Sequence, residues 1–546
     1  IGNVSYDGAY SIVVDEGGNV YTTGYFSGIT DFDPGIGVFN LTSTGSTDIF
    51  ISKLDALGNF LWAKRMGGTV RANSIFIALD NIGNIYTTGG FDGKVDFDPG
   101  PNTFYLTSNT EFGYGNTFIS KLDPSGNFIW AKQFIGDAFS IGHSLSIDDL
   151  GNVYTIGSFY TLVDFDPGNE VFDLRAKGYE DVYISKLDSS GNFIWAKQIG
   201  GTDYVEGTCI QVDATGSNIY ITGAFWGTVD FNPNEGVLNI SSNGSRDIFI
   251  SKLNSLGNLV WAKSIGGIDA DRGHSIALDN SNNIYITGEY SGTTDFNPGI
   301  GVFNLTAVLG QDCFVTKLDE SGNFIWAKSI GGTGPEEPGN CIKLDSKGDI
   351  IITGWFSGTS DFDPGVNTYN LTSLGSVDVF ITKLNATGNF VWAVQLGGVT
   401  DPFNGVYVSS WSSAIDGQDN ICTAGSFAGT VDFDPRLGTF NLTPVGLDDI
   451  FIHKMHSESL GVSENYFKEK YKLYPNPTKG HLQIDIDDIQ SEISVIVFNQ
   501  LTQVVQTEKF NFSNHIDINL TGNSGVYFIE IQSGNGALAY FKVIKN

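Results

Sequence analysis

Residues 268–332 decide the fold, and they read IDADRGHSIALDNSNNIYITGEYSGTTDFNPGIGVFNLTAVLGQDCFVTKLDESGNFIWAKSIGG. Variants of this unit recur along the chain, and the tryptophan of the WAK block marks the period. Successive tryptophans are 68, 65, 66, 65 and 66 residues apart: Trp62, Trp130, Trp195, Trp261, Trp326 and Trp392. Seven such units occupy residues 1 to about 456, so the chain is first of all a repeat protein.

Each unit contains four short apolar or alternating runs separated by turn sequences. In residues 268–332 the runs are HSIALD, IYITGEYSG continuing into TTDF, DCFVTKLD and NFIWAKSI. We name the corresponding strands a to d. The a–b and c–d links resemble D-x-x-G-N, in which Asp bonds the turn backbone and Gly accepts a positive φ. Repeated four-stranded antiparallel units predict an all-β fold, a seven-bladed β-propeller spanning residues 1–456, rather than a linear solenoid.

The ends of the repeat region predict how the ring closes. Ile1-Gly2 aligns with the IGG that follows WAK in other units, and the seventh unit stops at DIFIHKM without a GNFIWAK block. We therefore expect the last blade to take its outer strand from sequence upstream of Ile1, because a blade without that strand has an unpaired edge. The start at Ile1, without Met or a signal peptide, also leads us to expect an upstream segment.

Bulk composition excludes several classes of protein. The chain has 546 residues, with 29 Lys plus Arg against 61 Asp plus Glu and a net charge of −32. Such a charge disfavours nucleic acid, and no apolar run is long enough for a transmembrane helix. The four cysteines lack metal-binding spacing and are predicted to be buried, unpaired thiols: Cys209, Cys313, Cys341 and Cys422.

The motif DFDPG returns in the link between strands b and c of every unit. It occupies residues 31–35, 96–100, 164–168 and 361–365, with near-copies starting at 230, 295 and 432. The first acid is always Asp, whereas the second is Asn232 or Asn297 in two copies, which an acid/base pair would not tolerate. We predict a structural type II turn that opens a small hairpin, with the phenylalanine packed inward. Calcium remains the alternative, with four weak candidate ligands: Asp31, Asp33, Asp96 and Asp98.

Function is expected where the units disagree, and the d–a links vary most. These links should converge on the mouth of the central channel. The candidate ligand-binding residues there are His143, Glu206, Asp271, Arg272, His274, Glu336 and Glu337. Two histidines among carboxylates can hold a metal or grip a sugar, and Tyr204 lies in the same set of links. A solvated loop rim is the alternative interpretation. Trp226 and Trp355 in strand b are expected to pack between blades, and stacking on a sugar ring is the alternative.

No catalytic motif appears, and we assign no catalytic residue and no cofactor beyond the possible calcium ions. The repeats favour a non-enzymatic module that binds or adheres to glycan, matrix or another protein. A polysaccharide-degrading enzyme with its site at the channel mouth is the alternative, and a plain surface scaffold is the third possibility. Paired exposed aromatic residues at the mouth would indicate a lectin, and a tight cluster of histidines and acids would indicate an enzyme.

The repeat pattern stops at about Met455. Residues 457–470 are polar and lack the turn sequences, so we interpret them as a linker. Residues 471–546 begin with YKLYPNPTKGHLQIDI and continue with alternating apolar residues and Gly or Asn turns. This pattern predicts a small β-sandwich.

Both parts of the chain resemble known families. The repeats resemble bacterial β-propeller repeats of the DxxGNxYxTG type, which occur in large secreted proteins. Pro475-Asn476-Pro477 with Gly480, VIVFNQLTQVV, GVYFIEI and the terminal FKVIKN resemble the type A, Ig-like C-terminal sorting domain of type IX secretion cargo. Asn499 and Thr502 depart from the residues usual for that family in one turn.

The resemblance implies an export route. It implies transit through the periplasm and an outer-membrane translocon, recognition by a shuttle protein, and a secreted or cell-surface location. Cleavage within residues 457–470 often follows export in such proteins. The residues expected to contact the shuttle are Pro475, Asn476, Pro477, Gly480, Gly525, Tyr527, Lys542 and Lys545. The ligand of the propeller, a glycan or a protein, is not implied.

Overall fold

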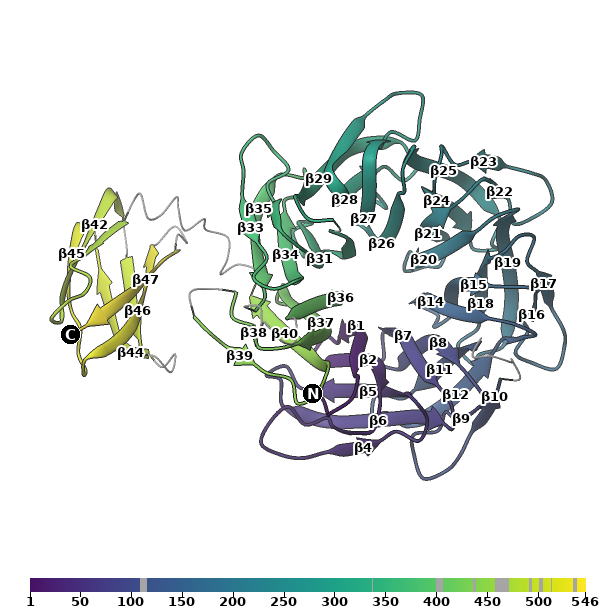
Figure 1. Cartoon of the computed structure of the whole chain (residues 1–546), viewed down its shortest axis with the longest axis horizontal. Helices are drawn as coiled ribbons and strands as arrows, with labels where there is room; N and C mark the ends of the chain where they lie inside the picture. The colour runs from purple at the N-terminus through teal and green to yellow at the C-terminus, as the bar shows by residue number, and fades with distance from the viewer. Residues whose placement is uncertain are drawn as a thin grey trace. The chain divides into compact units, whose positions relative to one another are not determined.

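The computed structural model describes the chain except residues 109–114, 336, 399–405, 436–437, 457–470, 491–492, 500–503, 512 and 534–537. Every regular element in the described part is a strand. The chain divides into two compact units, Ile1–Met455 and His456–Asn546 (Figure 1). The linker predicted for residues 457–470 lies outside the described residues.

In the described part of the first unit, the antiparallel strands fall into seven successive groups, one for each sequence repeat, which we call blades 1 to 7, and some neighbouring groups share one continuous sheet. Strands a to d of blades 1 to 3 are β1 (Gly8–Val14), β2 (Val20–Phe26), β5 (Asp48–Leu54) and β6 (Phe60–Gly68); β7 (Ala72–Leu79), β8 (Ile85–Phe91), β11 (Asn116–Leu122) and β12 (Phe128–Gln133), followed by β13 (Ile135–Gly136); β14 (Ser140–Ile147), β15 (Val153–Phe159), β18 (Asp181–Leu187) and β19 (Phe193–Gly201).

The later blades follow the same order. Their strands are β20 (Val205–Val212), β21 (Asn218–Phe225), β24 (Asp247–Asn254) and β25 (Leu259–Gly267) in blade 4; β26 (Arg272–Leu278), β27 (Ile284–Asp295), β28 (Asn304–Leu318) and β29 (Phe324–Gly332) in blade 5; β30 (Gly339–Leu344), β31 (Ile350–Phe356), β34 (Asp378–Leu384) and β35 (Phe390–Leu396) in blade 6; and β36 (Tyr407–Ile415), β37 (Asn420–Ala428) and β40 (Asp449–His456) in blade 7.

The blades form a ring around a central channel, with strand a of each blade innermost (Figure 1). Blade 7 contacts blade 1 through hydrogen bonds: Asp7 N donates to Asp448 O at 3.2 Å, and Ile12 N donates to the Ser412 side chain at Oγ, at 3.4 Å. Buried aliphatic and aromatic residues fill the spaces between neighbouring sheets. The predicted all-β propeller is confirmed.

In blade 7 the described residues provide strands a, b and c. Ile1 lies beside β40, where Ile1 N donates to Ile450 O at 3.2 Å and Ile450 N donates to Ile1 O at 2.8 Å. In blade 4, Ile265 of strand d pairs with Ile248 of strand c at the equivalent place. The fourth strand expected from upstream sequence stays a prediction.

The turn sequences act as predicted at the a–b and c–d links. In the first link Asp15 Oδ1 accepts hydrogen bonds from Gly17 N and Asn19 N, both at 2.9 Å. Gly18 has a φ of 77°, which favours glycine because a side chain is strained there. The same Asp also lies near the strand-c lysine, with Lys53 Nζ 3.9 Å from Asp15 Oδ2. The recurring Asp and Lys are therefore structural.

DFDPG opens a two-stranded hairpin in the b–c link. Its strands are β3 (Ile29–Asp31) and β4 (Asn40–Thr42), β9 (Lys94–Asp96) and β10 (Tyr105–Thr107), β16 (Leu162–Asp164) and β17 (Asp173–Arg175), β22 (Thr228–Asp230) and β23 (Asn239–Ser241), β32 (Thr359–Asp361) and β33 (Asn370–Thr372), and β38 (Val431–Asp432) and β39 (Asn441–Leu442); in blade 5 the hairpin continues β27 and β28.

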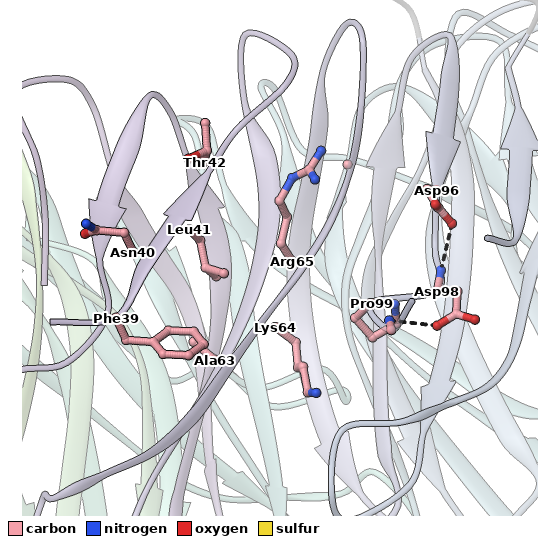
Figure 2. A pocket seen from close by; sticks show the side chains of 12 residues that line it. Phe39, Asn40, Leu41, Thr42, Ala63, Lys64, Arg65, Asp96, Asp98 and Pro99 are labelled. Atoms are coloured by element: carbon pink, nitrogen blue, oxygen red, sulfur yellow. Dashed lines mark hydrogen bonds between the residues drawn. The ribbon is translucent and has the colours of Figure 1, made fainter. Parts of the chain in front are cut away.

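The contacts in blade 2 show how the acids work. Asp96 Oδ1 accepts hydrogen bonds from Asp98 N and Phe104 N, and Asp98 Oδ1 accepts one from Gly100 N (Figure 2). Phe97 between them is fully buried. None of the described DFDPG glycines has a positive φ, so the prediction of a type II turn is wrong. The Asp98 side chain makes the turn instead, as an Asx turn.

The motif occurs in every blade because it also joins the blades. Strand d of one blade pairs through its last residues with the first Asp of DFDPG in the next blade. The pairs are Gly2–Asp31, Gly67–Asp96, Ile135–Asp164, Gly200–Asp230, Gly266–Asp295, Gly331–Asp361 and Gly397–Asp432. We call this pairing the interblade joint.

A buried carboxylate lies against the same glycine of the joint. In blade 4 a Cβ on Gly266 would be 2.1 Å from Asp247 Cγ, and Asp247 Oδ2 accepts a hydrogen bond from Asn243 N at 3.0 Å. Six blades share this Asp–Gly contact: Asp48–Gly67, Asp181–Gly200, Asp247–Gly266, Asp312–Gly331, Asp378–Gly397 and Asp449–Gly2. The carboxylate leaves room only for glycine.

Blade 2 is the exception, and both partners differ there. Asn116 replaces the aspartate, and Ile135 replaces the glycine. Strand d breaks between β12 and β13, and the Ile135 side chain is 51% exposed. The joint still forms, because Ile135 pairs with Asp164 through its backbone.

The second unit is a sandwich of two sheets. One contains β41 (Tyr471–Tyr474), β42 (His481–Gln490) and β45 (Ser513–Asn519); the other contains β43 (Ile493–Phe498), β44 (Val504–Phe510), β46 (Gly525–Ser533) and β47 (Leu538–Lys545). Alternate residues of both sheets, such as Ile484, Val495 and Ile529, form its buried core. The predicted β-sandwich is confirmed. All four cysteines of the propeller are buried and free, also as predicted.

Candidate functional site

The d–a links and the b–c links lie on the same face of the propeller. Isolated parallel bridges join them, including Glu180 with Tyr204 and Tyr6 with Asp448. The two kinds of link therefore share one face, as expected from the sequence, and their role at the channel mouth stays a prediction.

Two of the predicted mouth residues have structural contacts. Asp271 is fully buried, where its carboxylate accepts hydrogen bonds from Gly267 N at 2.8 Å and Thr294 Oγ1 at 2.9 Å. Glu337 is 1% exposed and accepts a hydrogen bond from Ser360 Oγ at 2.6 Å. Burial raises the pKa of Asp271 to about 6 and that of Glu337 to about 8. Glu336 lies outside the described residues.

His143 and His274 occupy β-bulges of the innermost strands. The same bulge position in all blades holds Tyr10, Ile75, His143, Thr208, His274, Asn340 and Trp411, which we call the bulge ring. His143 Nδ1 lies 2.8 Å from Gly207 O, whereas His274 Nε2 lies 3.7 Å from Glu289 Oε2. Blade 4 separates the two histidines in the ring, and they have different partners.

A cluster of charged residues connects blades 4 and 5. Arg272 Nη2 pairs with Glu206 Oε1, and Arg246 Nη2 lies 2.6 Å from Glu289 Oε1. Burial alone would raise the pKa of Glu289, but His274, Arg246 and Arg272 outweigh it and lower the pKa. Glu289 is therefore favoured in its ionised form, and both glutamates are paired with arginine. A general acid needs a raised pKa, which Glu289 does not have.

An aromatic surface lies beside this cluster. Tyr179 and Tyr204 stack with ring centroids 5.3 Å apart and an interplanar angle of 10°, and they are 63% and 41% exposed. Trp226 meets Tyr204 edge-on at 5.8 Å, and Arg246 Cζ lies 5.8 Å from the centroid of Trp226. We call Tyr179, Tyr204, Trp226 and Arg246 the tyrosine platform.

Sequence reasoning identified Tyr204 and Trp226 but missed Tyr179 and Arg246. A usable signal was present, because the positions equivalent to Tyr179 hold a small residue in most units, such as Ser46, Ser245 and Ser376. The sequence has tyrosine there in two units, at Tyr114 and Tyr179, and an aromatic residue at a position that is serine in three other units indicates a local role.

A pocket of about 510 Å³ lies between blades 1 and 2, at the DFDPG hairpin (Figure 2). Phe39, Lys64, Arg65, Asp96 and Asp98 contribute to its lining. Arg65 Nε is held by Asp48 Oδ2 at 2.6 Å. Among the described residues, no group of three or more His, Cys, Asp or Glu side chains is arranged to hold a metal ion. A calcium role for Asp31, Asp33, Asp96 and Asp98 stays a prediction.

In the second unit, the predicted sorting residues come together at one end of the sandwich. Asn476 Oδ1 accepts a hydrogen bond from Ile544 N at 2.9 Å, and Thr478 bridges Lys545. Lys545 Nζ donates to Leu520 O and Gly522 O, both at 2.7 Å, and Gly525 pairs with Lys545.

The remaining sorting candidates lie near this end or further along the strand. Pro475 and Pro477 are exposed, and Gly480 has a φ of 116° with Lys545 Cε 3.2 Å from the position of its missing Cβ. Tyr527 Oη donates to Asn523 O at 2.7 Å. Lys542 pairs with Phe528 in the middle of β46 and β47, away from the loop.

The fold and the tail define a propeller carried by an export domain, and comparisons with known proteins agree. Residues 472–546 match the secretion system C-terminal sorting domain, and residues 260–297 match the beta-propeller repeat. The chain is thus a type IX secretion cargo with propeller repeats. Its sorting domain directs export through the outer membrane to the cell surface or the medium and implies an interaction with the type IX machinery.

Similar curated proteins share the repeats at low identity. The uncharacterized WD repeat-containing protein L264 of Acanthamoeba polyphaga mimivirus is 24% identical over 78% of this chain and 36% of its own length. The regulatory protein FlaEY of Caulobacter vibrioides is 24% identical over 47% of this chain and 26% of its own length. The matched part of the chain thus spans about a third and a quarter of these relatives.

Similar solved structures include Sqt1 from Chaetomium thermophilum, with a TM-score of 0.37, 11% identity and coverage of 77% of this chain and 94% of that one. A protein of unknown function from Bacteroides caccae has a TM-score of 0.30, 8% identity and coverage of 63% and 89%. Within the described residues of this chain, no helix has the length and apolar character needed to cross a membrane.

Proposed function

We propose that the exported propeller is a non-enzymatic binding module whose ligand is a surface glycan held on the tyrosine platform. The exposed stack of Tyr179 on Tyr204 carries this proposal, because exposed flat rings offer an apolar face to the C–H groups of a sugar. Tyrosine also places a hydroxyl at the edge of that face, and few conformations are lost on binding. The platform belongs to blades 3 and 4, and no second stacked tyrosine pair occurs among the described residues of the ring.

The nearby charges favour binding over hydrolysis. Glycoside hydrolysis uses two carboxyl groups, one of which acts as an acid. Here Glu206 and Glu289 are each paired with arginine, and the carboxyls of Asp271 and Glu337 are buried against the backbone or a serine hydroxyl. The exposed rings of the platform can therefore hold a ligand, whereas the charged side chains beside them are already paired with one another.

Retention on insoluble algal, plant and host polysaccharides tests the proposal with the whole chain. We expect Tyr204→Ala to reduce retention about tenfold, as for the loss of one aromatic anchor. Tyr105→Ala is the matched control, because Tyr105 is also an exposed tyrosine, 50% exposed, with Lys94 Nζ 3.8 Å from its ring. Sugar ends released by the wild type would instead indicate an enzyme. Equal retention of both variants would reject the platform.

We further propose that the shuttle protein of the export system contacts the end of the sandwich formed by Pro475 to Gly480 and Lys545. The hydrogen bonds from Lys545 Nζ to two carbonyl groups support this role, because they fix the C-terminal strand beside the proline loop. We expect Lys545→Ala to lower the exported fraction, and Lys472→Ala, an exposed lysine of the same domain, to leave it unchanged. Export of Lys545→Ala at the wild-type level would contradict this assignment.

A further inference from the structure

A second aromatic cluster lies where blades 7 and 1 meet. Trp411 on β36 and Tyr10 on β1 both belong to the bulge ring, and their rings are 6.0 Å apart at 74°. Tyr25 on β2 lies 5.4 Å from Tyr10 at 41°. Trp411 is 44% exposed on an innermost strand, so its ring faces the channel. In the other blades the same bulge position holds no aromatic residue: Ile75, His143, Thr208, His274 and Asn340.

The cluster is fixed before any ligand arrives. Gly8 lies under Tyr25, since a Cβ on Gly8 would be 2.8 Å from Tyr25 Cε1. On its other side, the Tyr25 ring is in contact with the Tyr10 ring. Rings held in this way lose little conformational freedom when a ligand binds, which favours affinity.

Polar groups lie beside this cluster. The side chain of Trp411 is 44% exposed, and within the described part of the chain its Nε1 donates to no protein acceptor. The Asp448 carboxyl and the Tyr407 hydroxyl lie near Tyr25, and the exposed Tyr6 bridges Asp448 through its backbone. An exposed indole with hydroxyl groups and a carboxyl group nearby matches the C–H face and the hydroxyl groups of a sugar ring.

We infer that Trp411, Tyr10 and Tyr25 form a second binding site, which takes an uncharged pyranose ring of a glycan. The Asp448 carboxyl near Tyr25 and the net charge of −32 disfavour an acidic sugar. The second site rests on the proposed function only for the class of its ligand. It is separate from the tyrosine platform, because the two sites occupy different blades and share no residue.

Fluorine NMR on the whole chain labelled with 5-fluorotryptophan tests this site. The Trp411 signal is assigned by its loss in Trp411→Phe, which keeps an aromatic ring in place. The probes are neutral gluco-, manno- and galacto-oligosaccharides and oligomers of N-acetylglucosamine. We expect one of these series to shift the Trp411 signal equally in the wild type and in Tyr204→Ala. Trp411→Ala should weaken that binding about tenfold, and Ile75→Ala, at the same bulge in blade 2, should not.

The outcomes separate the two proposals. An unmoved Trp411 signal overturns the second site, whatever Tyr204→Ala does to retention on polysaccharides. A shift produced by a proline-rich peptide and by none of the sugars overturns the ligand class. A shift that persists in Tyr204→Ala while retention is lost supports two separate sites. Both Trp411 variants must unfold at the same thermal midpoint as the wild type before their affinities are compared.

Discussion

The interblade joint and the channel mouth are built from the same repeat units, yet they behave in opposite ways. At the joint an Asp of DFDPG pairs with the end of the preceding strand d in every blade, and in six blades a buried carboxylate lies against the paired glycine. At the mouth the bulge ring differs in every blade except for its two histidines, and the tyrosine platform occurs once. Repeated contacts hold the ring together, and unrepeated ones are available for a ligand.

Blade 2 shows what the joint tolerates. The pair Asn116 and Ile135 replaces Asp and Gly together, and strand d breaks so that the isoleucine side chain turns outward. The joint is therefore specified by a pair of residues, and neither is free to change alone. The residues at the channel mouth do not change together with a second position in this way. Mutations should therefore separate the two regions, with joint variants losing stability and mouth variants losing ligand.

The largest effect is expected for Gly266→Ala. Its Cβ would lie 2.1 Å from Asp247 Cγ, which forces the buried carboxylate or the joint to move. We expect the free energy of unfolding to fall by about 3 kcal/mol, measured by urea denaturation. Gly417→Ala is the control, because nothing lies within 4 Å of its Cβ position. A wild-type midpoint for Gly266→Ala would refute the steric role of the carboxylate.

The double variant Asp247→Asn with Gly266→Ile copies the blade 2 pair into blade 4. If the two positions act together, the double variant should be more stable than the sum of the single changes predicts, by about 1 kcal/mol or more. The measurement is a double-mutant cycle of unfolding free energies. Simple additivity would mean that the blade 2 pair arose without mutual dependence.

A pH effect of intermediate size should come from the joint. Burial raises the pKa of Asp247 to about 7 from an ordinary value of 3.8, so the folded state holds a proton that the unfolded state has released. The stability that this proton gives is complete below pH 3.8 and is lost as pH rises to about 7, at a rate of at most about 1.4 kcal/mol per pH unit. Asp247→Asn should flatten this part of the profile in urea denaturation. An unchanged slope would contradict the assignment.

The smallest stability effect is expected at the mouth. Tyr179→Ala removes an exposed ring, 63% exposed, and should change the unfolding free energy by no more than about 0.5 kcal/mol. The same variant should reduce polysaccharide retention as Tyr204→Ala does. A large loss of stability in Tyr179→Ala would mean that the platform stabilises the fold. The contrast between the interblade joint and the channel mouth would then be wrong.

The fold could be predicted because its signals are local and repeated. The tryptophan period, the Asp and Gly of the hairpins and the alternating runs of the tail each follow from neighbouring residues, and the structure confirms the propeller, the sandwich and the free cysteines. The turn type of DFDPG was wrong, because the side chain of its second acid replaces the backbone geometry that Pro and Gly suggested.

The candidate site could be predicted only in part. The sequence located the face and several of its residues, including Tyr204, Glu206 and Arg272. It could not tell that Asp271 and Glu337 turn inward, or that Tyr179 reaches Tyr204 from another blade. Burial and stacking depend on residues that are far apart in the chain. The repeat pattern predicts the positions that all units share, but not the contacts of residues that occur in one unit alone.

The sequence by itself determined the strand order, the repeat and the export route. Periodicity, turn chemistry and the sorting motifs each depend on residues that are close together in the chain. The tertiary structure alone decided which unrepeated residues meet. The stacked tyrosines, the paired acids of blades 4 and 5 and the contact of Trp411 with Tyr10 all join different blades. Closure of the ring, which brings blade 7 beside blade 1, creates the last of these contacts.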